Sequence, residues 1–355
     1  VVFLIVLGSF LSKKIEVEFI SYKKLYPNFI YPDKFTRDDV QEPKETSTFK
    51  IKKLITFYNP FSWVNAALKC TGDIVHAQFW SPPTAVIYSI IFPILKFKNK
   101  RLILTIHNVK PHENNFIYNF FEKLIFKYPD VFVVHSDINK KTFLERYPNK
   151  RVEIIPHGVF DFFKVENLTQ KEAKKRLNLE DKNIILYFGI IREYKGIDIL
   201  LKAFHLSNLK DTVLIIAGKP WLDWKEYEKL IEDLNLKDKV KTFTKFLPNS
   251  EVNILLSASD LVVLPYKYFD GQSGVGNAAL AYDKPLLVTN TGALIELVKN
   301  KEAIVEANNI EDLSRKLTKI MQNKKLLSSL SKDSAKLKKE FSWENVAEKT
   351  VKLYK

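Results

Sequence analysis

The chain has 355 residues, 46% of them hydrophobic, and a formal net charge of +15. This length is enough for two cores of ordinary domain size, and the charge favours anionic partners such as nucleotides, phosphorylated lipids, acidic membranes or nucleic acid. The single cysteine, Cys70, excludes a disulfide framework and a cysteine-rich zinc site, and it fits a reducing, cytoplasmic location.

The first apolar residues are expected to form a helix. If residues 1–6 and 15–22 were neighbouring parallel strands, only eight residues would join them, whereas a crossover needs about a dozen or more. We therefore predict that residues 1–13 are the end of a helix, and that a first strand and its loop precede residue 1. A signal peptide is the alternative, but the run has no basic leader and no small-residue cleavage site.

The two longest apolar runs, residues 1–11 and 85–95, are shorter than the roughly 18 residues that a membrane-spanning helix needs. We therefore expect a chain that does not cross a membrane, although it could lie on one.

From residue 15 onward, β-branched apolar runs alternate with helical segments, which is typical of parallel sheets covered on both faces. The strands expected in the first half lie at residues 15–22, 49–58, 73–79, 101–107, 131–136 and 152–158. Residues 26–48 are rich in proline and charge and predict an exposed loop. The polar residues 160–182 predict a connection between two domains.

The same alternation starts again after this connection. The strands expected there lie at residues 183–191, 212–218, 239–247, 261–265, 285–290 and 302–306. Two doubly wound α/β domains of similar build follow, with an amphipathic helix at residues 342–355 and Ser342 as its N-cap. Because such sheets bind ligands beyond the carboxyl ends of their strands, we expect a cleft between the two domains.

Polar and glycine residues gather where predicted strands end. His107 ends one strand, Arg192 and Lys195 follow another, and a Gly-Gln-Ser-Gly loop, residues 271–274, precedes a predicted helix at 275–281. The first turn of a helix presents unpaired N–H groups and the positive end of its dipole, so this loop predicts an anion site. A plain turn with a helix N-cap is the alternative.

Segments in both halves resemble, in order and spacing, the retaining glycosyltransferases of family 4. In the second half these are "YFGIIREYKGIDILLKAF", "LIIAGKP", "SDLVVLPY" and "AYDKPLLVTNTGALIELV". In the first half they are "DIVHAQF", "LTIHNVKP" and "EIIPHGV", and "FSWENVAEKTVKLY" resembles the family's terminal helix.

The resemblance implies the GT-B architecture, in which two Rossmann-like domains close around a nucleotide-sugar. Residues 1–160 would form the acceptor-side domain and residues 161–335 the nucleotide-sugar-binding domain. Residues 336–355 would form a C-terminal helix that packs back on the first domain.

The resemblance also implies roles for the strand-end residues. Arg192 and Lys195 would hold the donor diphosphate, where two fixed cations stabilise charge that develops on the leaving phosphate. His107 would lie beside the donor sugar and act through its carbonyl or its ring. The alternatives are a solvated loop for the basic pair and a backbone-bonded histidine for His107. We assign structural roles to the histidines at positions 76, 135 and 157.

One departure from the family pattern concerns two glutamates eight positions apart. Aligned on "KPLLVT", the first falls on Asp270 and the second on Ala278. Asn277 and Asp270 then become the candidates for the ribose hydroxyls, and a glutamate at position 278 is expected to tighten nucleotide binding if the helix presents that position to the ribose.

The candidate residues form two sets. The catalytic candidates are His107, Arg192, Lys195 and Asp270, and the donor-binding candidates are Gly271, Gln272, Ser273, Gly274, Val275 and Asn277. No set of histidines or carboxylates has metal-ligand spacing, so we expect no metal and no cofactor.

The expected function is retaining, metal-independent transfer of a sugar from a UDP- or GDP-sugar to a glycan or lipid-linked acceptor, as in polysaccharide or glycoconjugate biosynthesis. The departing phosphate would accept the acceptor's proton, since no pair of carboxylates stands out. The alternative is a GT-B protein that binds a nucleotide-sugar or glycan without turnover. Nucleic-acid binding is supported by charge alone, and no motif for it is present.

Residues 114–130 place aromatic residues and lysines at helical spacing. The apolar stripe of Phe116, Phe120 and Leu124 is expected to pack on the sheet. Its alternative is an interfacial helix that meets anionic lipid through Lys123 and Lys127, which would attach the chain peripherally to the inner face of the plasma membrane.

Overall fold

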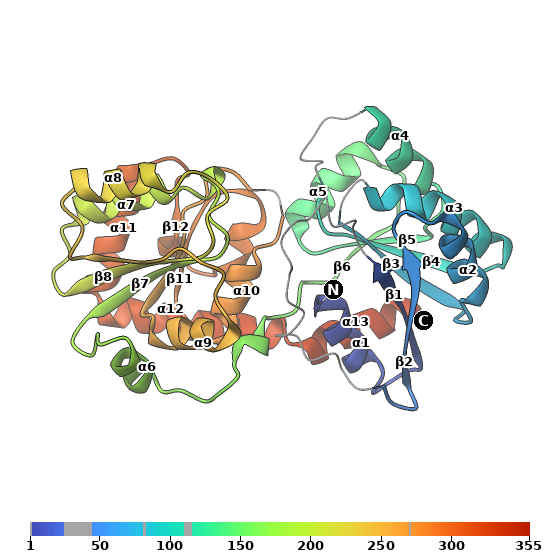
Figure 1. Ribbon diagram of the computed structural model, residues 1–355, viewed down its shortest axis with the longest axis horizontal. Coiled ribbons are helices and arrows are strands. Elements are labelled where there is room, and N and C mark those ends of the chain that lie inside the picture. The colour runs from blue at the N-terminus through green and yellow to red at the C-terminus, as the bar shows by residue number, and fades with distance from the viewer. Residues whose placement is uncertain (1, 25–44, 81–82, 110–115, 270) are drawn as a thin grey trace. The chain divides into compact units, whose positions relative to one another are not determined.

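The computed structural model describes residues 2–24, 45–80, 83–109, 116–269 and 271–355 (Figure 1). The chain divides into two compact units. One unit combines Val1–Gly158 with Trp343–Lys355, and the other is the continuous stretch Val159–Ser342.

The second unit is built on a six-stranded sheet whose order is β12-β11-β10-β7-β8-β9. All neighbouring strands in it are parallel. The strands are β7 Asn183–Phe188, β8 Thr212–Ala217, β9 Val240–Phe243, β10 Leu261–Leu264, β11 Leu286–Thr289 and β12 Ile304–Val305. Read from β9, the order is that of a Rossmann fold, 3-2-1-4-5-6.

Helices cover both faces of this sheet (Figure 1). They are α6 Gln170–Arg176, α7 Ile197–Ser207, α8 Lys225–Asp233, α9 Asn249–Ala258, α10 Gly274–Ala281, α11 Ile310–Gln322 and α12 Lys324–Glu340. Because successive strand residues point to opposite faces, Leu186 packs in a core with α9, α10 and α12, while Ile185 and Tyr187 pack in a core with α7, α8 and α11.

The first unit contains a parallel pair of strands, β1 Val17–Lys24 and β2 Phe49–Thr56, and a parallel sheet of order β3-β4-β5-β6. The strands of this sheet are β3 Ile74–Phe79, β4 Arg101–Ile106, β5 Val131–Val134 and β6 Val152–Ile154. The helices are α1 Val2–Leu11, α2 Pro60–Lys69, α3 Pro83–Phe97, α4 Phe116–Ile125, α5 Asp137–Arg146 and α13 Trp343–Tyr354. One core joins the sheet to α2, α3, α4 and α5, and a second core joins it to α1 and α13.

The terminal helix α13 is fixed to the first unit by both apolar and polar contacts. Trp343 packs on Gly158, where an added Cβ would lie 2.6 Å from the indole ring. The Arg101 guanidinium donates to the carbonyls of Leu353 at 3.0 Å and Tyr354 at 2.8 Å, which satisfies acceptors that a helix end leaves unpaired.

The structure differs from the sequence predictions at both ends of the second unit. Residues 336–355 were expected to form one helix, but α12 continues to Glu340 within the second unit and only Trp343–Lys355 belong to the first. Residues 160–182 were expected to be a connection, but they lie in the second unit and include α6, which a Thr169–Glu172 capping box begins. Most of the predicted loop at 26–48 lies outside the described residues.

Candidate functional site

The topology of the second unit creates a switch point between β7 and β10. These strands are neighbours, but the chain leaves β7 toward β8 on one side and β10 toward β11 on the other. Open α/β sheets bind ligands in the crevice that forms outside the carboxyl ends of two such strands. The loop after β7 carries Arg192 and Lys195, and the loop after β10 leads into α10.

Lys195 and Ser273 are brought together by Tyr266. Lys195 is buried, with 9% of its surface exposed, and its Nζ donates to the Tyr266 hydroxyl at 3.3 Å. The same hydroxyl lies 3.3 Å from Ser273 Oγ. A hydrogen-bonded chain thus connects the loop after β7 to the N-terminus of α10. Tyr266 was not among the predicted site residues.

The charge of Lys195 is poorly compensated within the described part of the chain. Burial lowers the pKa of Lys195, as does nearby Arg192, whereas Tyr194 opposes the shift. Among the described residues, no carboxylate lies within ion-pair distance of Lys195 Nζ. A buried cation without a counterion is costly, so this position favours an anionic ligand.

Arg192 lies at the exposed side of the same loop. Its guanidinium stacks over the ring of Trp221 at 4.3 Å from the centroid, and Trp221 N donates to Ile191 O at 2.9 Å. This stacking orients the guanidinium while leaving its N–H groups for a second partner. Trp221 was not among the predicted site residues.

The N-terminus of α10 provides backbone donors at this switch point. Ser273 is its N-cap, and Ser273 Oγ accepts from Gly276 N at 3.2 Å. Among the described residues, the N–H groups of Gly274 and Val275 have no hydrogen-bond acceptor, and both residues are partly exposed. Two donors at the positive end of a helix dipole fit the predicted anion site.

Glycines allow these loops to approach each other closely. Gly189, directly after β7, has φ +116°, and an added Cβ would lie 2.8 Å from Val275 Cγ2 and 3.5 Å from Lys195 Nζ. At Gly274 an added Cβ would lie 2.6 Å from the Phe160 ring. A side chain at Gly189 would force the two loops apart, and one at Gly274 would displace the Phe160 ring.

The other predicted positions around this loop are buried, half-buried or outside the described residues. Gly271 is buried and Gln272 is half-buried, whereas Asp270 lies outside the described residues. Asn277 is 1% exposed, and neither its Nδ2 nor its Oδ1 has a hydrogen-bond partner. An unpaired buried amide costs about 1–3 kcal/mol, so a hydroxyl-bearing ligand would be a suitable partner.

Ala278 does not face a ligand. Its side chain is 0% exposed and packs in the core that joins the sheet to α9 and α12. The expectation that a glutamate at this position would reach a ribose is therefore wrong for this structure, because α10 turns position 278 inward.

In the first unit, polar side chains meet at the carboxyl ends of the strands. His107 directly follows β4, and its Nε2 lies 2.8 Å from Gln78 Oε1 on β3. Its Nδ1 lies 3.1 Å from Nε2 of His135, which follows β5. Nδ1 of His135 lies 2.9 Å from the Ile155 carbonyl, and Trp80 stacks on the His107 ring at 5.0 Å.

These contacts define the ring tautomers. A carbonyl only accepts, so His135 donates from Nδ1 to Ile155 O and, when neutral, accepts at Nε2 from His107 Nδ1. A neutral His107 then has no proton on Nε2, so Gln78 can donate to it only with the amide turned by about 180° from the orientation in which Oε1 faces the ring. Both ring nitrogens of His107 are therefore engaged within the protein. Gln78 and His135 contact the His107 ring from both sides; Gln78 was not among the predicted site residues, and His135 had been assigned a structural role.

Burial keeps this histidine cluster neutral. It lowers the pKa of His107 well below its ordinary value, that of His135 to about 4 and that of His157 to about 3. His76 lies beside α13, hydrogen-bonded to the Tyr354 hydroxyl at 2.8 Å, and its pKa is lowered to about 4 by burial.

Acid should therefore destabilise the first unit. Since the folded chain holds His135 neutral, the unfolded chain binds more protons between the ordinary pKa of 6.5 and about 4. His135 alone should contribute about 3 kcal/mol that is fully present above pH 6.5 and is lost progressively toward pH 4. Calorimetric unfolding midpoints measured from pH 7.5 to 4.5 test this. His135→Asn should flatten the profile, and the exposed-site control His205→Asn should not; equal profiles for all three proteins would contradict it.

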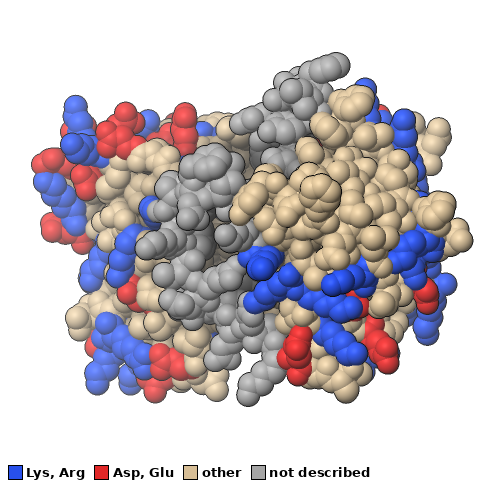
Figure 2. All heavy atoms as spheres, turned by 45° about the vertical axis from the view of Figure 1, so that its right-hand side comes forward, with Lys and Arg blue, Asp and Glu red and all other residues tan. Residues whose placement is uncertain are grey.

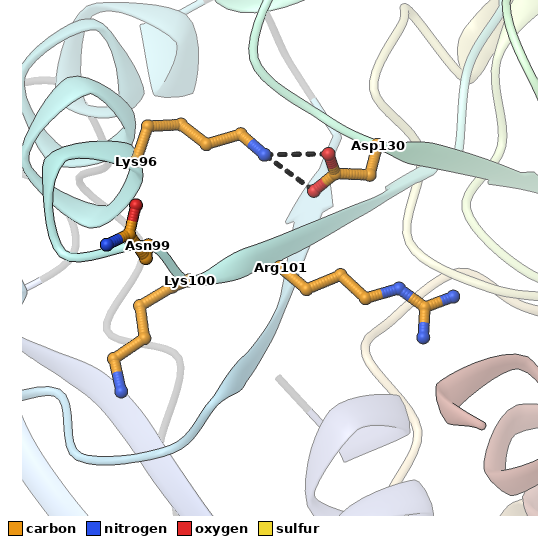
Figure 3. Close-up of a pocket in the computed structure, with 5 residues that line it drawn as sticks. All are labelled: Lys96, Asn99, Lys100, Arg101 and Asp130. Carbon is orange, nitrogen blue, oxygen red and sulfur yellow. Dashed lines mark hydrogen bonds and ion pairs between the residues drawn. The ribbon is translucent and has the colours of Figure 1, made fainter.

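A shallow hollow at the opposite edge of this sheet has a structural role. Lys96, Asn99, Lys100, Arg101 and Asp130 line it, and Figure 3 shows Lys96 directed at Asp130. Lys96 Nζ lies 2.7 Å from both Asp130 oxygens, Lys100 pairs with Asp73, and Arg101 binds the end of α13. Burial alone would raise the pKa of Asp130, but hydrogen bonds from Lys96 and the Leu102 amide bring it below its ordinary value. The charged side chains of this hollow therefore stabilise the fold.

Within the described residues, no group of histidine, cysteine and carboxylate side chains is arranged to hold a metal ion.

Family models match both halves of the chain. Residues 4–160 match "Glycosyltransferase Family 4", and residues 169–337 match "Glycosyl transferases group 1". The chain belongs to the GT-B glycosyltransferases.

Solved structures resemble this glycosyltransferase in fold. Anabaena HepE in complex with UDP and glucose has a TM-score of 0.70 and 14% identity over 86% of this chain and 85% of that chain. Sucrose-phosphate synthase of Thermosynechococcus elongatus has a TM-score of 0.74 and 20% identity over 98% of this chain and 90% of that chain.

Relatives of this glycosyltransferase include enzymes with known acceptors. Lipopolysaccharide 1,2-N-acetylglucosaminetransferase of Salmonella typhimurium is 26% identical over 61% of this chain. D-inositol 3-phosphate glycosyltransferase of Nocardioides is 25% identical over 66% of it. The matches span 60% and 55% of these relatives' own lengths.

Proposed function

We propose that this protein transfers a sugar, with retention of configuration and without a metal, from a UDP- or GDP-sugar to a glycan or lipid-linked acceptor. The observation that carries the donor assignment is Lys195, a buried cation with no carboxylate partner among the described residues, linked through Tyr266 to the N-cap of α10. Glycosyltransferase relatives and a structural neighbour with bound UDP support the same class of donor.

In this proposal the diphosphate is held by three kinds of donor. Lys195 supplies a buried charge, Arg192 an exposed and stacked guanidinium, and Gly274 and Val275 two backbone N–H groups. All act most strongly when the glycosidic bond breaks, because the leaving phosphate then gains negative charge. The buried amide of Asn277 would pair with a hydroxyl of the nucleotide or sugar.

His107 would act on the donor sugar through its main chain. Its ring nitrogens contact Gln78 and His135, which hold the ring in place, and we assign the contact with the sugar to the main-chain carbonyl. A carbonyl oxygen near the anomeric carbon would stabilise the positive charge that develops there. The departing phosphate would accept the proton of the acceptor hydroxyl.

A second candidate function is binding of a nucleotide-sugar or glycan without turnover. It is favoured by Ala278, which stands in the core at the position where the family pattern has its second carboxylate. Binding and turnover must therefore be measured separately.

The two functions differ in whether the donor is consumed. Calorimetry with UDP and GDP should show binding of one of them, and incubation with the matching UDP- or GDP-sugars should release the nucleoside diphosphate. Excess EDTA should not slow this release, and the anomeric signal of the product by NMR should match that of the donor. Binding without release would establish the second function, and absence of binding to both nucleotides would contradict the first function and the nucleotide-sugar form of the second.

A further inference from the structure

An unusually exposed apolar surface lies on the first unit. Phe97 at the end of α3 is 91% exposed, Phe61 in the first turn of α2 is 84% exposed, and Leu68 and Tyr58 are 60% and 55% exposed. We name these four residues the α2–α3 face. Large apolar side chains that protrude this far are characteristic of surfaces that meet a partner.

The four side chains belong to adjoining elements. α2 packs on α3, and Phe61 and Leu68 are seven residues apart on α2, which places them on the same side of that helix. Lys98 Nζ donates to the carbonyls of Leu68 at 2.8 Å and Cys70 at 3.0 Å, so the residue after Phe97 lies at the end of α2. Tyr58 directly precedes Asn59, the N-cap of α2.

The sequence around this face is basic and nearly free of acids. Residues 46–112 contain nine lysines and arginines and a single acidic residue, Asp73, for a net charge of +8 out of +15 for the chain. Lys50, Lys53 and Lys69 are exposed, and residues 83–95 of α3 carry no charged side chain. Figure 2 shows Lys and Arg gathered along one side of a broad uncharged area of this unit.

This combination fits a membrane surface better than a nucleic acid. Anionic headgroups attract lysines by about 1 kcal/mol each near the surface, and protruding phenylalanines enter the boundary between headgroups and acyl chains. A nucleic acid would also meet the lysines, but its phosphates would lose water against the uncharged part of α3.

The predicted interfacial helix contributes less to such a surface. On α4, Phe120 is exposed, but Ile125 is fully buried, and the buried Glu122 pairs with Arg146 at 2.9 Å. This helix therefore packs on the unit through one side, but the predicted packing stripe is wrong at Phe120, because the buried positions are Glu122 and Ile125. Within the described residues, no helix is long and apolar enough to span a bilayer.

We propose that the α2–α3 face docks on an anionic lipid bilayer, with Phe61, Leu68 and Phe97 inserted at the headgroup boundary and the lysines around them facing the headgroups. The inference does not depend on the reaction proposed above, because it concerns a different surface and is measured without a sugar donor.

Vesicle sedimentation with the full chain tests the proposal. The protein should bind vesicles of phosphatidylcholine with phosphatidylglycerol at least tenfold better than vesicles of phosphatidylcholine alone, and added salt should weaken binding. The double variant Phe61→Ser/Phe97→Ser should bind at least tenfold more weakly. Its side chains are already exposed, so the unfolding midpoint should not change.

Matched controls distinguish binding through this face from nonspecific binding by exposed apolar side chains and from the effect of charge. Leu206→Ser/Phe246→Ser removes side chains that are 54% and 60% exposed on the second unit and should leave binding intact. Lys50→Glu/Lys69→Glu should lose the preference for anionic vesicles. The proposal is overturned if the wild type fails to bind anionic vesicles at low salt, if both apolar double variants bind alike, or if single-stranded RNA binds and the Phe61→Ser/Phe97→Ser variant still binds vesicles normally.

Discussion

Replacing Lys195 with alanine should lower kcat/KM for sugar transfer by about 10²- to 10³-fold. The buried Nζ donates to Tyr266 beside the α10 N-terminus, and in the proposed function its charge would be aimed at the leaving phosphate in a water-poor environment. Removing one such preorganised group costs about 3–4 kcal/mol of transition-state stabilisation. Steady-state release of nucleoside diphosphate from the donor measures the change.

Stability measurements distinguish this effect from misfolding. Since Lys195 is a buried cation without a carboxylate among the described residues, its removal should leave the unfolding midpoint unchanged or raise it. Lys202→Ala, an exposed change on the following helix α7, should alter neither rate nor midpoint. Arg192→Ala should cost about tenfold, since that side chain is exposed. Full activity in a folded Lys195→Ala variant would contradict the proposed role of Lys195 in holding the diphosphate.

Replacing Ala278 with glutamate should destabilise the second unit by roughly 3–5 kcal/mol. The side chain is 0% exposed in a core that consists mainly of leucines, alanines and valines, where a carboxylate loses its hydration. Thermal unfolding should show the transition of this unit at a lower temperature, with nucleotide binding weakened in parallel.

A smaller substitution provides the control for position 278. Ala278→Ser adds one hydroxyl that an α-helix can satisfy through the carbonyl of the preceding turn, and should cost about 1 kcal/mol. A stable Ala278→Glu variant with tighter nucleotide binding would show instead that α10 presents this position to the ligand.

The sheet and the convergence of the site could be predicted because both depend on chain order. Apolar runs such as 212–218 and 261–265 predict buried parallel strands, and the observed β8 and β10 lie within them. Once β7 and β10 are neighbours at the switch point, Lys195 and Ser273 must lie at the same edge of the sheet. Chain order and the switch-point rule therefore indicated that the loops after β7 and β10 meet.

Other features depend on the direction of side chains, which spacing does not determine. Asn277 and Ala278 are adjacent on one helix, about 100° apart around its axis, and spacing alone does not show that Asn277 has an unpaired buried amide while Ala278 packs in the core. Tyr266 ends an apolar run and gives no sign that its hydroxyl joins Lys195 to Ser273. His135 became a partner of His107 only through the pairing of β4 with β5.

The first unit is formed by two separate segments of the chain, and this determines the order in which the two units can finish folding. Ribosomes add roughly 5–20 residues per second from the N-terminus, and domains fold as units while they emerge. The continuous stretch Val159–Ser342 is finished before α13 exists, whereas Ile103, Val131 and Val133 still await Trp343 and Val346. The half that is synthesised first is thus the half that is completed last. Until then, α1 is the one described helix that covers this apolar side of its sheet, the kind of surface on which chaperones and aggregation act.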